Sequence, residues 1–106
     1  MKIIRLYPDK LPYRFEIEKF TFEIFSNMYS GDIYMTGYDV DGNVLGNGAE
    51  KLILDMPLWW IYQADINNNR DTRYPKFNLI PRSVDGKIYP ITKDNLNSKI
   101  VLEYLL

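Results

Sequence analysis

The sequence predicts an all-β protein: a small antiparallel β-sandwich or barrel of about seven short strands, with at most one short helical turn. Two observations lead to this prediction. Runs rich in Ile, Val, Tyr, Phe and Thr alternate apolar with polar residues, as strands do when one face is buried. Clusters of Gly, Asn, Asp and Pro separate these runs roughly every 8 to 12 residues, a spacing typical of turns in such folds.

The alternation also locates the individual strands. Phe15 and Ile17 alternate with charged residues, and the apolar set then moves from odd to even positions at Glu18-Lys19. Such a shift requires a tight turn or a bulge between two strands. Further strands are expected in residues 2–6, 33–40, 43–54, 76–83 and 100–106, with Pro81 interrupting the strand in which it lies.

Two Asp-Gly dipeptides predict hairpins. Asp41-Gly42 lies between Val40 and Val44 and predicts a type I′ turn, since Gly adopts positive φ freely and Asp tolerates it. Residues 84–91, VDGKIYPI, predict a second Asp-Gly hairpin. The likeness of the two stretches is weak evidence for duplication, because hairpins reuse the same dipeptides for the same steric reason.

The first of these turns also has some features of a calcium-binding loop. Counting from Asp39, oxygen-bearing side chains stand at positions 1, 3, 5 and 12 of an EF-hand loop, the last three being Asp41, Asn43 and Glu50. The glycine required at position 6 is missing, because Val44 stands there, and the flanking residues favour strands over helices. We therefore expect a turn and no metal site.

Between the strands, residues 55–66 are ambiguous and are expected to form a loop with one helical turn at most. The polar residues 67–75 predict an exposed loop, and residues 92–99 a loop or a short helical turn. The domain organisation expected is an N-terminal strand or arm, residues 1–12, followed by a single β domain, residues 13–106.

Composition limits the classes of function. The chain has 106 residues, 46% of them hydrophobic, which is enough for one buried core. Lys and Arg number 13 against 14 acidic residues, so we expect no direct recognition of nucleic acid. We also expect a soluble, unexported protein that does not insert into membranes, because no apolar run resembles a signal peptide or spans a bilayer.

The sequence has no Cys and no His. This excludes disulfides, thiolate nucleophiles and a Ser-His-Asp triad, and it removes the commonest general base and the commonest metal ligand. The acidic pairs Glu16/Glu18 and Asp39/Asp41 could serve glycoside hydrolysis, but their spacing of two places each pair on one solvated strand face. We therefore expect no catalytic residues, no cofactor and no enzymatic activity.

The aromatic residues around position 60 are the strongest candidates for binding. Trp59, Trp60 and Tyr62 could form a stacking platform for a sugar, which would make the protein a small carbohydrate-binding or adhesion module. Neighbouring residues on a strand point to opposite faces, which favours one tryptophan in the core and the other against a partner subunit. The arginines in RDTRY suit carboxylates of a neighbouring subunit or phosphate. The predicted interface set is Trp59, Trp60, Tyr62, Arg70, Arg73 and Tyr74.

The order of elements adds a resemblance to a known family. A strand precedes FTFEIFSN, a second strand that ends near an Asn, and a Ser-Gly-Asp turn follows. A strand then leads into Asp-Gly-Asn, a glycine-containing return follows, and Leu-x-Tyr-Leu closes the chain at Leu102–Leu105. In these features the chain resembles the small plug proteins of contractile-tailed phage baseplates, and it departs from them in its Trp-Trp pair and its Asn-rich loop.

This resemblance implies a structural role rather than a catalytic one. It implies that the protein is part of a phage tail, or of a phage-derived, tail-like particle, and lies at the baseplate or tube end. It also implies that the protein is made in the bacterial cytoplasm. The implied partners are other tail proteins, such as tube, tube initiator and hub proteins, together with further copies of the chain in a ring around the tail axis. The family has no catalytic residues to carry over onto this sequence.

Overall fold

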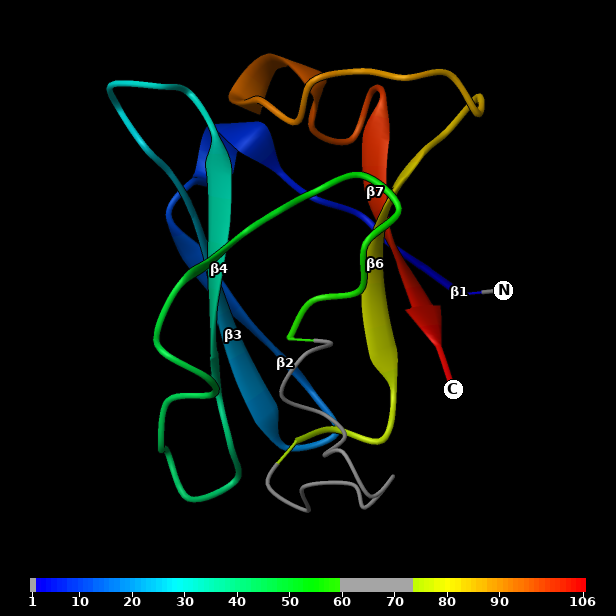
Figure 1. The fold of residues 1–106 in the computed structure, drawn as a ribbon. Coiled ribbons are helices and arrows are strands. Elements are labelled where there is room, and N and C mark those ends of the chain that lie inside the picture. The colour runs from blue at the N-terminus through cyan, green and yellow to red at the C-terminus, as the bar shows by residue number, and fades with distance from the viewer. Residues whose placement is uncertain (1, 60–73) are drawn as a thin grey trace.

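The computed structural model describes residues 2–59 and 74–106. Within these ranges the chain forms seven strands in two antiparallel sheets and two one-turn 3-10 helices, which confirms the all-β prediction with one more helical turn than expected (Figure 1). The elements in chain order are β1 (Lys2–Ile4), η1 (Pro8–Lys10), β2 (Tyr13–Ile17), β3 (Phe20–Ser26), β4 (Ile33–Tyr38), β5 (Glu50–Lys51), β6 (Asn78–Ser83), η2 (Lys93–Asn95) and β7 (Ile100–Leu105).

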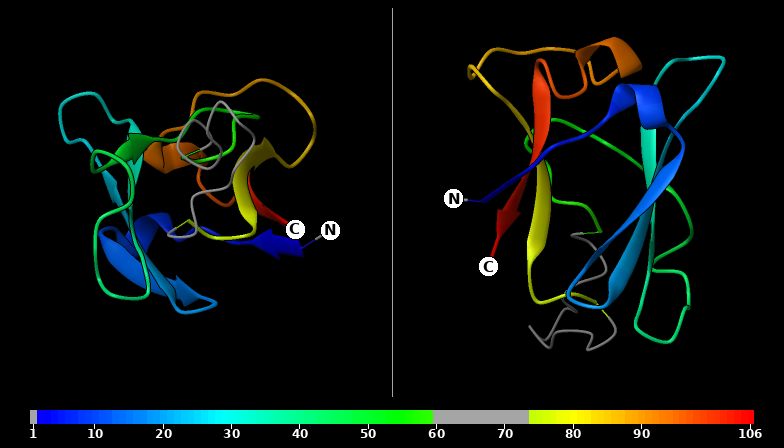
Figure 2. Two further views of the ribbon diagram at one scale, coloured as in Figure 1. Left: turned by 60° about the horizontal axis from the view of Figure 1, so that its bottom comes forward. Right: turned by 180° about the vertical axis from the view of Figure 1, so that it is seen from behind.

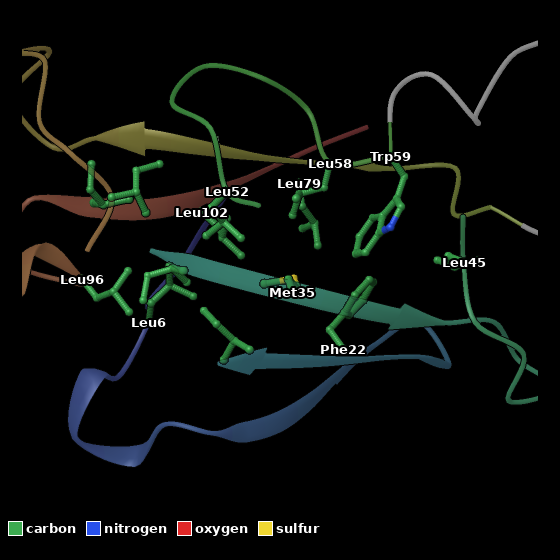
Figure 3. Close-up of a cluster of buried hydrophobic side chains, with 14 of the residues drawn as sticks. Leu6, Phe22, Met35, Leu45, Leu52, Leu58, Trp59, Leu79, Leu96 and Leu102 are labelled. Atoms are coloured by element: carbon green, nitrogen blue, oxygen red, sulfur yellow. The ribbon is translucent and has the colours of Figure 1, made fainter. Parts of the chain in front are cut away.

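The two sheets differ in how far apart in the sequence their strands lie. The four-stranded sheet has the order β2-β3-β4-β5, so each strand pairs with the next one along the chain. The three-stranded sheet has the order β1-β7-β6 and therefore brings together the two ends of the chain, with Lys2 opposite Tyr104 (Figure 1). The sheets face each other, and the core fills the space between them (Figures 2 and 3).

The tight turn predicted at Glu18-Lys19 is confirmed. Ile17 pairs with Phe20, and the two residues between them have positive φ, 49° and 74°. Positive φ at both central residues is the requirement of a type I′ turn, which matches the twist of the two flanking strands. The shift of the apolar set from odd to even positions thus marks a two-residue hairpin between β2 and β3.

The turn predicted at Asp41-Gly42 exists, but its type is different. Gly42 has φ 86°, whereas Asp41 is not among the residues with positive φ, so a type I′ turn is wrong here. The Gly42 N–H donates to the Asp39 carbonyl at 3.0 Å, and the Asp39 N–H donates to the Asn43 carbonyl at 2.8 Å. This is the three-residue loop in which a type I turn precedes a left-handed residue. A type I′ turn has two loop residues, and both need positive φ. This loop has three residues, and only Gly42 needs positive φ.

Three strand predictions need correction. The second Asp-Gly turn forms, with Gly86 at φ 77°, but residues 87–91 are not a strand, and β6 pairs instead with β7. Pro81 does not interrupt β6, because it pairs with Leu102 of β7 while its carbonyl accepts from the Asp55 N–H on the other side of the strand. The N and O atoms of one strand residue point to the same side, so the N–H that proline lacks lies where β6 has no further strand partner among the described residues. The return arm expected over residues 43–54 contains only β5.

The segment after β5 connects the two sheets. The Leu52 N–H donates to the carbonyl of Ile33, the first residue of β4, at 2.9 Å. Further on, the Asp55 and Leu58 N–H groups donate to the carbonyls of Pro81 and Leu79 in β6, at 2.8 and 2.9 Å. Residues 52–58 therefore cover the outer edge of β6 and close one side of the sandwich (Figures 1 and 2).

The core is made of aliphatic side chains with a group of aromatic rings at one end. Phe22 lies at the centre of this group, with its ring centroid 5.7 Å from Trp59 and 6.3 Å from Phe77. Leu6, which follows β1, is fully buried, so the N-terminal segment contributes to this core. The side chains labelled in Figure 3 are Leu6, Phe22, Met35, Leu45, Leu52, Leu58, Trp59, Leu79, Leu96 and Leu102.

Candidate interaction surfaces

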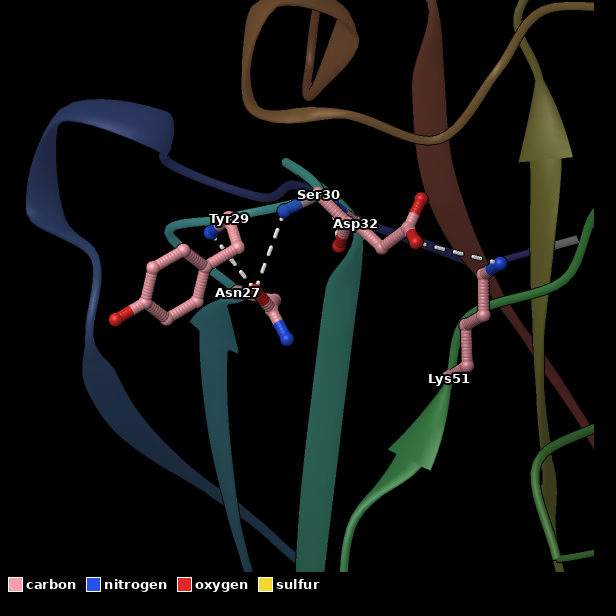
Figure 4. Close-up of polar contacts among 5 residues, drawn as sticks. All are labelled: Asn27, Tyr29, Ser30, Asp32 and Lys51. Atoms are coloured by element: carbon pink, nitrogen blue, oxygen red, sulfur yellow. Dashed lines mark hydrogen bonds and ion pairs between the residues drawn. The ribbon is translucent and has the colours of Figure 1, made fainter.

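The turn between β3 and β4 is held by a dense set of hydrogen bonds (Figure 4). The Asn27 side-chain oxygen accepts from the N–H groups of Tyr29 and Ser30, at 2.8 and 3.2 Å. The Asn27 backbone N–H donates to the Asp32 carbonyl at 2.9 Å. The Asp32 carboxylate pairs with Lys51 of β5 at 3.4 Å, which ties the turn to the next strand. The turn is therefore held by its own hydrogen bonds and by one ion pair to β5.

The same turn exposes large apolar side chains. Met28 is 85% exposed and Tyr29 is 93% exposed. A single exposed apolar side chain is ordinary, but Met and Tyr are enriched at protein interfaces, and here two of them stand side by side on a turn that is already ordered. A partner binding them would not have to order the turn, which lowers the entropic cost of association.

The outer face of the three-stranded sheet carries a second surface, a shallow groove of about 570 Å³. Its most buried charge is Glu103, 8% exposed, whose carboxylate lies 3.6 Å from Arg82 Nε. Arg82 also donates to Asp55 at 2.9 Å, and this hydrogen bond, with the nearby Glu103 charge, raises the pKa of the guanidinium. The ion pair with Arg82 offsets part of the cost of burying Glu103. The lining residues are Ile3, Arg5, Arg82, Ser83, Val84, Val101 and Glu103.

The predicted interface set divides into two groups. Trp59 and Tyr74 lie in the core, 1% and 3% exposed. The backbone N–H of Trp59 donates to the Glu50 carboxylate at 2.8 Å, and the Tyr74 hydroxyl accepts from the backbone N–H of Gly46 at 2.7 Å. Trp60, Tyr62, Arg70 and Arg73 lie outside the described residues. A role of this set at an interface stays a prediction.

The acidic stretch that resembles a calcium loop is occupied by backbone donors. One oxygen of the Asp39 carboxylate accepts from the N–H groups of Asp41 and Asn43, at 2.9 and 2.8 Å. Asp39 is only 6% exposed, so these bonds are shielded from water. Among residues 2–59 and 74–106, no three acidic side chains gather in a way that could hold a metal ion. The arrangement is that of a turn whose first residue caps its own loop.

Sequence reasoning overlooked Met28 and Tyr29. The Ser-Gly-Asp turn was recognised, but the two large apolar residues that directly precede it were not interpreted as a surface feature. The contrast between these two apolar residues and the polar residues around them is the signal in the sequence that could have revealed this surface. The groove on the three-stranded sheet had no such signal, because its lining comes from β1, β6 and β7, and the sequence does not show that these strands are neighbours.

Two antiparallel sheets packed face to face, with an ordered turn that exposes Met28 and Tyr29, define a small all-β sandwich domain. The comparison with protein families identifies which one: the whole chain, residues 1–106, matches the family described as cyanophage baseplate Pam3 plug gp18. The chain belongs to this family of phage baseplate plug proteins, as its resemblance implied.

Membership gives the protein a structural role in the phage baseplate, a location in the tail of the virion and an association with other baseplate components. No curated protein and no solved structure matches the chain. In the part of the chain that the structure describes, no helix has the length and apolar character needed to cross a membrane.

Proposed function

We propose that this protein is a structural component of a contractile tail, or of a particle derived from one, and that it sits at the baseplate or tube end. Several copies surround the tail axis and contact the tube, tube initiator and hub proteins. The protein fills the space between neighbouring tail proteins and connects them, without catalysis. The observation that supports this proposal is the match of the entire chain, rather than a part of it, to the baseplate plug family.

The turn between β3 and β4 supplies a physical basis for such contacts. Its two apolar side chains are more than four-fifths exposed, while the backbone that carries them is fixed by hydrogen bonds and by the Asp32–Lys51 ion pair. Large side chains on a preordered backbone are the usual anchors of protein interfaces. In the proposed assembly, Met28 and Tyr29 insert into an apolar recess of a neighbouring baseplate protein.

The alternative function, a carbohydrate-binding or adhesion module, uses Trp59, Trp60 and Tyr62, of which only Trp59 lies within the described residues. The ring of Trp59 is 1% exposed and packs against Phe22 with 5.7 Å between the ring centroids. A sugar could stack on it only after the core had opened. Residues 2–59 and 74–106 therefore offer no observation that favours this alternative over a tail component.

Electron microscopy of tail particles from the source bacterium tests the proposal. The expected result is density for the two-sheet domain at the baseplate or tube end, in several copies around the axis, with the chain detected in the same particles by mass spectrometry. Absence of the chain from every tail assembly would overturn the proposal.

Substitutions test the proposed role of the turn. Met28→Ser with Tyr29→Ser is expected to lower the recovery of the chain with the particles, because the anchoring side chains are lost while Asn27 still holds the turn. Ile88→Ser is a matched control, since Ile88 is 91% exposed on a different connection. Equal recovery of the wild-type and double-mutant chains would show that the turn makes no essential contact.

A further inference from the structure

The sandwich is closed on one side and open on the other. Residues 52–58 bridge β4 and β6 through backbone hydrogen bonds and so cover the side where β5 and β6 are the outermost strands. On the opposite side the outermost strands are β1 and β2, and neither has a second strand partner among the described residues (Figures 1 and 2). Alternate N–H and C=O groups of such edge strands point outward and can pair with another chain.

A groove of about 440 Å³ lies between these two free edges. It is lined by Lys2 and Ile4 of β1, by Phe15, Glu16 and Ile17 of β2, and by Glu18 and Tyr104. Residues from both sheets therefore form its walls.

The floor of the groove is an extension of the core that reaches solvent. Ile4, Phe15, Ile17 and Tyr104 all pack against the buried cluster but are only partly buried themselves. The Phe15 ring lies 5.5 Å from that of Phe22, which is fully buried. An apolar segment laid in the groove would complete this layer of the core, and removing that apolar surface from water would favour binding.

The rim of the groove is acidic. Glu16 is exposed, and Glu18 accepts a hydrogen bond from the Tyr104 hydroxyl at 3.0 Å. Partial burial, together with this hydrogen bond, raises the pKa of Tyr104. The one cation of the lining, Lys2, lies over the Tyr104 ring with its Nζ 5.3 Å from the ring centroid. Two carboxylates against one ammonium leave the groove with net negative charge.

We propose that this groove receives one extended segment of a neighbouring baseplate protein, which adds a strand to the free edge of β2. The segment carries apolar side chains at alternate positions, facing Phe15 and Ile17, and Lys or Arg between them, facing Glu16. Strand addition at a sheet edge gives affinity through backbone hydrogen bonds and specificity through alternate side chains. The inference rests on the proposed function, since it names the contact through which the protein would join its assembly.

A second copy of the same chain fits this groove less well. A two-fold contact brings the same surface of both copies together, and here it would set the acidic rim of one copy against the acidic rim of the other. Like charges placed directly opposite each other are destabilising. Charge complementarity therefore favours a basic segment from a different protein.

Photo-cross-linking in assembled particles tests the inference. A benzophenone amino acid replaces Glu16 in one variant and Lys87, an exposed residue on the connection after β6, in a control variant. The expected result is a cross-link from position 16, and not from position 87, to a segment of another baseplate protein that has alternating apolar and basic residues. Mass spectrometry identifies that segment.

The outcomes separate the two proposals. If the variant chain enters the particles but position 16 gives no cross-link, or reaches only another copy of this chain, the groove proposal is overturned and the baseplate role stands. If the wild-type chain is absent from all particles, both proposals fall.

Charge reversal gives an independent readout in case the photoreactive variant folds poorly. Glu16→Lys is expected to lower recovery with the particles severalfold, whereas Asp94→Lys, an equal change at an exposed position in η2, is expected to leave recovery unchanged. Circular dichroism and thermal melting of both purified variants verify the fold. Recovery of a folded Glu16→Lys chain at the wild-type level would overturn the proposal.

Discussion

The indole ring of Trp59 occupies the space that a side chain on Gly37 would need. A Cβ at Gly37 would lie 2.9 Å from the Cη2 and Cζ2 atoms of Trp59 and 3.0 Å from a methyl carbon of Leu45. Gly37 is the penultimate residue of β4, and glycine within a strand normally weakens it. Its presence there is explained by the close approach of the ring.

Gly37→Ala is therefore expected to destabilise the domain by about 1–3 kcal/mol through overpacking. Urea unfolding followed by circular dichroism measures this change. In a Trp59→Phe background the smaller ring relieves the overlap, so the same substitution at Gly37 is expected to cost less. Equal costs in the two backgrounds would contradict the assignment of the strain to the Trp59 ring.

Gly42→Val is expected to lower the free energy of unfolding by more than about 1 kcal/mol, because a β-branched residue resists positive φ. Gly42 has φ 86° and no heavy atom within 4 Å of where its Cβ would be, so strain of the backbone rather than crowding is the cause. Gly42→Asn is the matched control and is expected to cost less, since Asn tolerates the left-handed region. A valine variant as stable as the asparagine variant would be inconsistent with this turn.

Asp39→Ala is expected to destabilise the domain by about 1–3 kcal/mol, since it removes a carboxylate that accepts from the N–H groups of Asp41 and Asn43. Millimolar calcium is expected to leave the melting temperature of the wild-type protein unchanged, because backbone donors already occupy this carboxylate. Differential scanning fluorimetry measures both effects. A rise in melting temperature with calcium, abolished by a chelator and by Asp39→Asn, would indicate a metal site instead.

Asp85 gives a prediction for acidic pH. The Tyr89 hydroxyl donates to its carboxylate at 2.6 Å and the Lys87 N–H donates at 2.9 Å, and these hydrogen bonds lower the pKa of Asp85. A lowered folded-state pKa means that the stabilisation is present above the ordinary carboxyl pKa of about 3.9 and is lost as pH falls through the lower folded value. The second Asp-Gly turn is therefore expected to loosen in acid.

An NMR titration of the Asp85 carboxyl carbon measures this pKa. In Tyr89→Phe it is expected to rise toward the ordinary value, because the hydrogen bond that contributes most to the shift is removed. Ser83→Ala, which removes a longer hydrogen bond of 3.2 Å to the same carboxylate, is expected to cause a smaller rise. An unchanged pKa in Tyr89→Phe would refute the assigned cause.

How far the sequence alone predicted the structure depended on the range of the interactions involved. The β2–β3 hairpin was predictable because the alternation of Phe15 and Ile17, and its shift at Glu18-Lys19, are set by neighbouring residues. The partner of β6 was not, because the Asp-Gly turn after it fits a hairpin equally well and only tertiary packing selects β7. Whether a candidate surface could be predicted also depended on how far apart in the sequence its residues lie. The Met28-Tyr29 turn could have been found in the sequence, but the groove between β1 and β2 depends on which strands become edges.

The pairing of β1 with β7 has a consequence for the order of folding. Strands β2, β3 and β4 join neighbours through short connections, so their pairing closes small loops, whereas the three-stranded sheet must bring opposite ends of the polypeptide together. Contacts between distant residues form slowly, because the entropy of closing a long loop is lost before the contact is gained. We expect amides of β3 and β4 to gain protection first in pulse-labelling hydrogen exchange, and those of β7 last. Until β7 has formed its pairs, Leu6 has no core in which it can be buried. During that time the β2–β3–β4 hairpins form a sheet with one apolar face exposed to water.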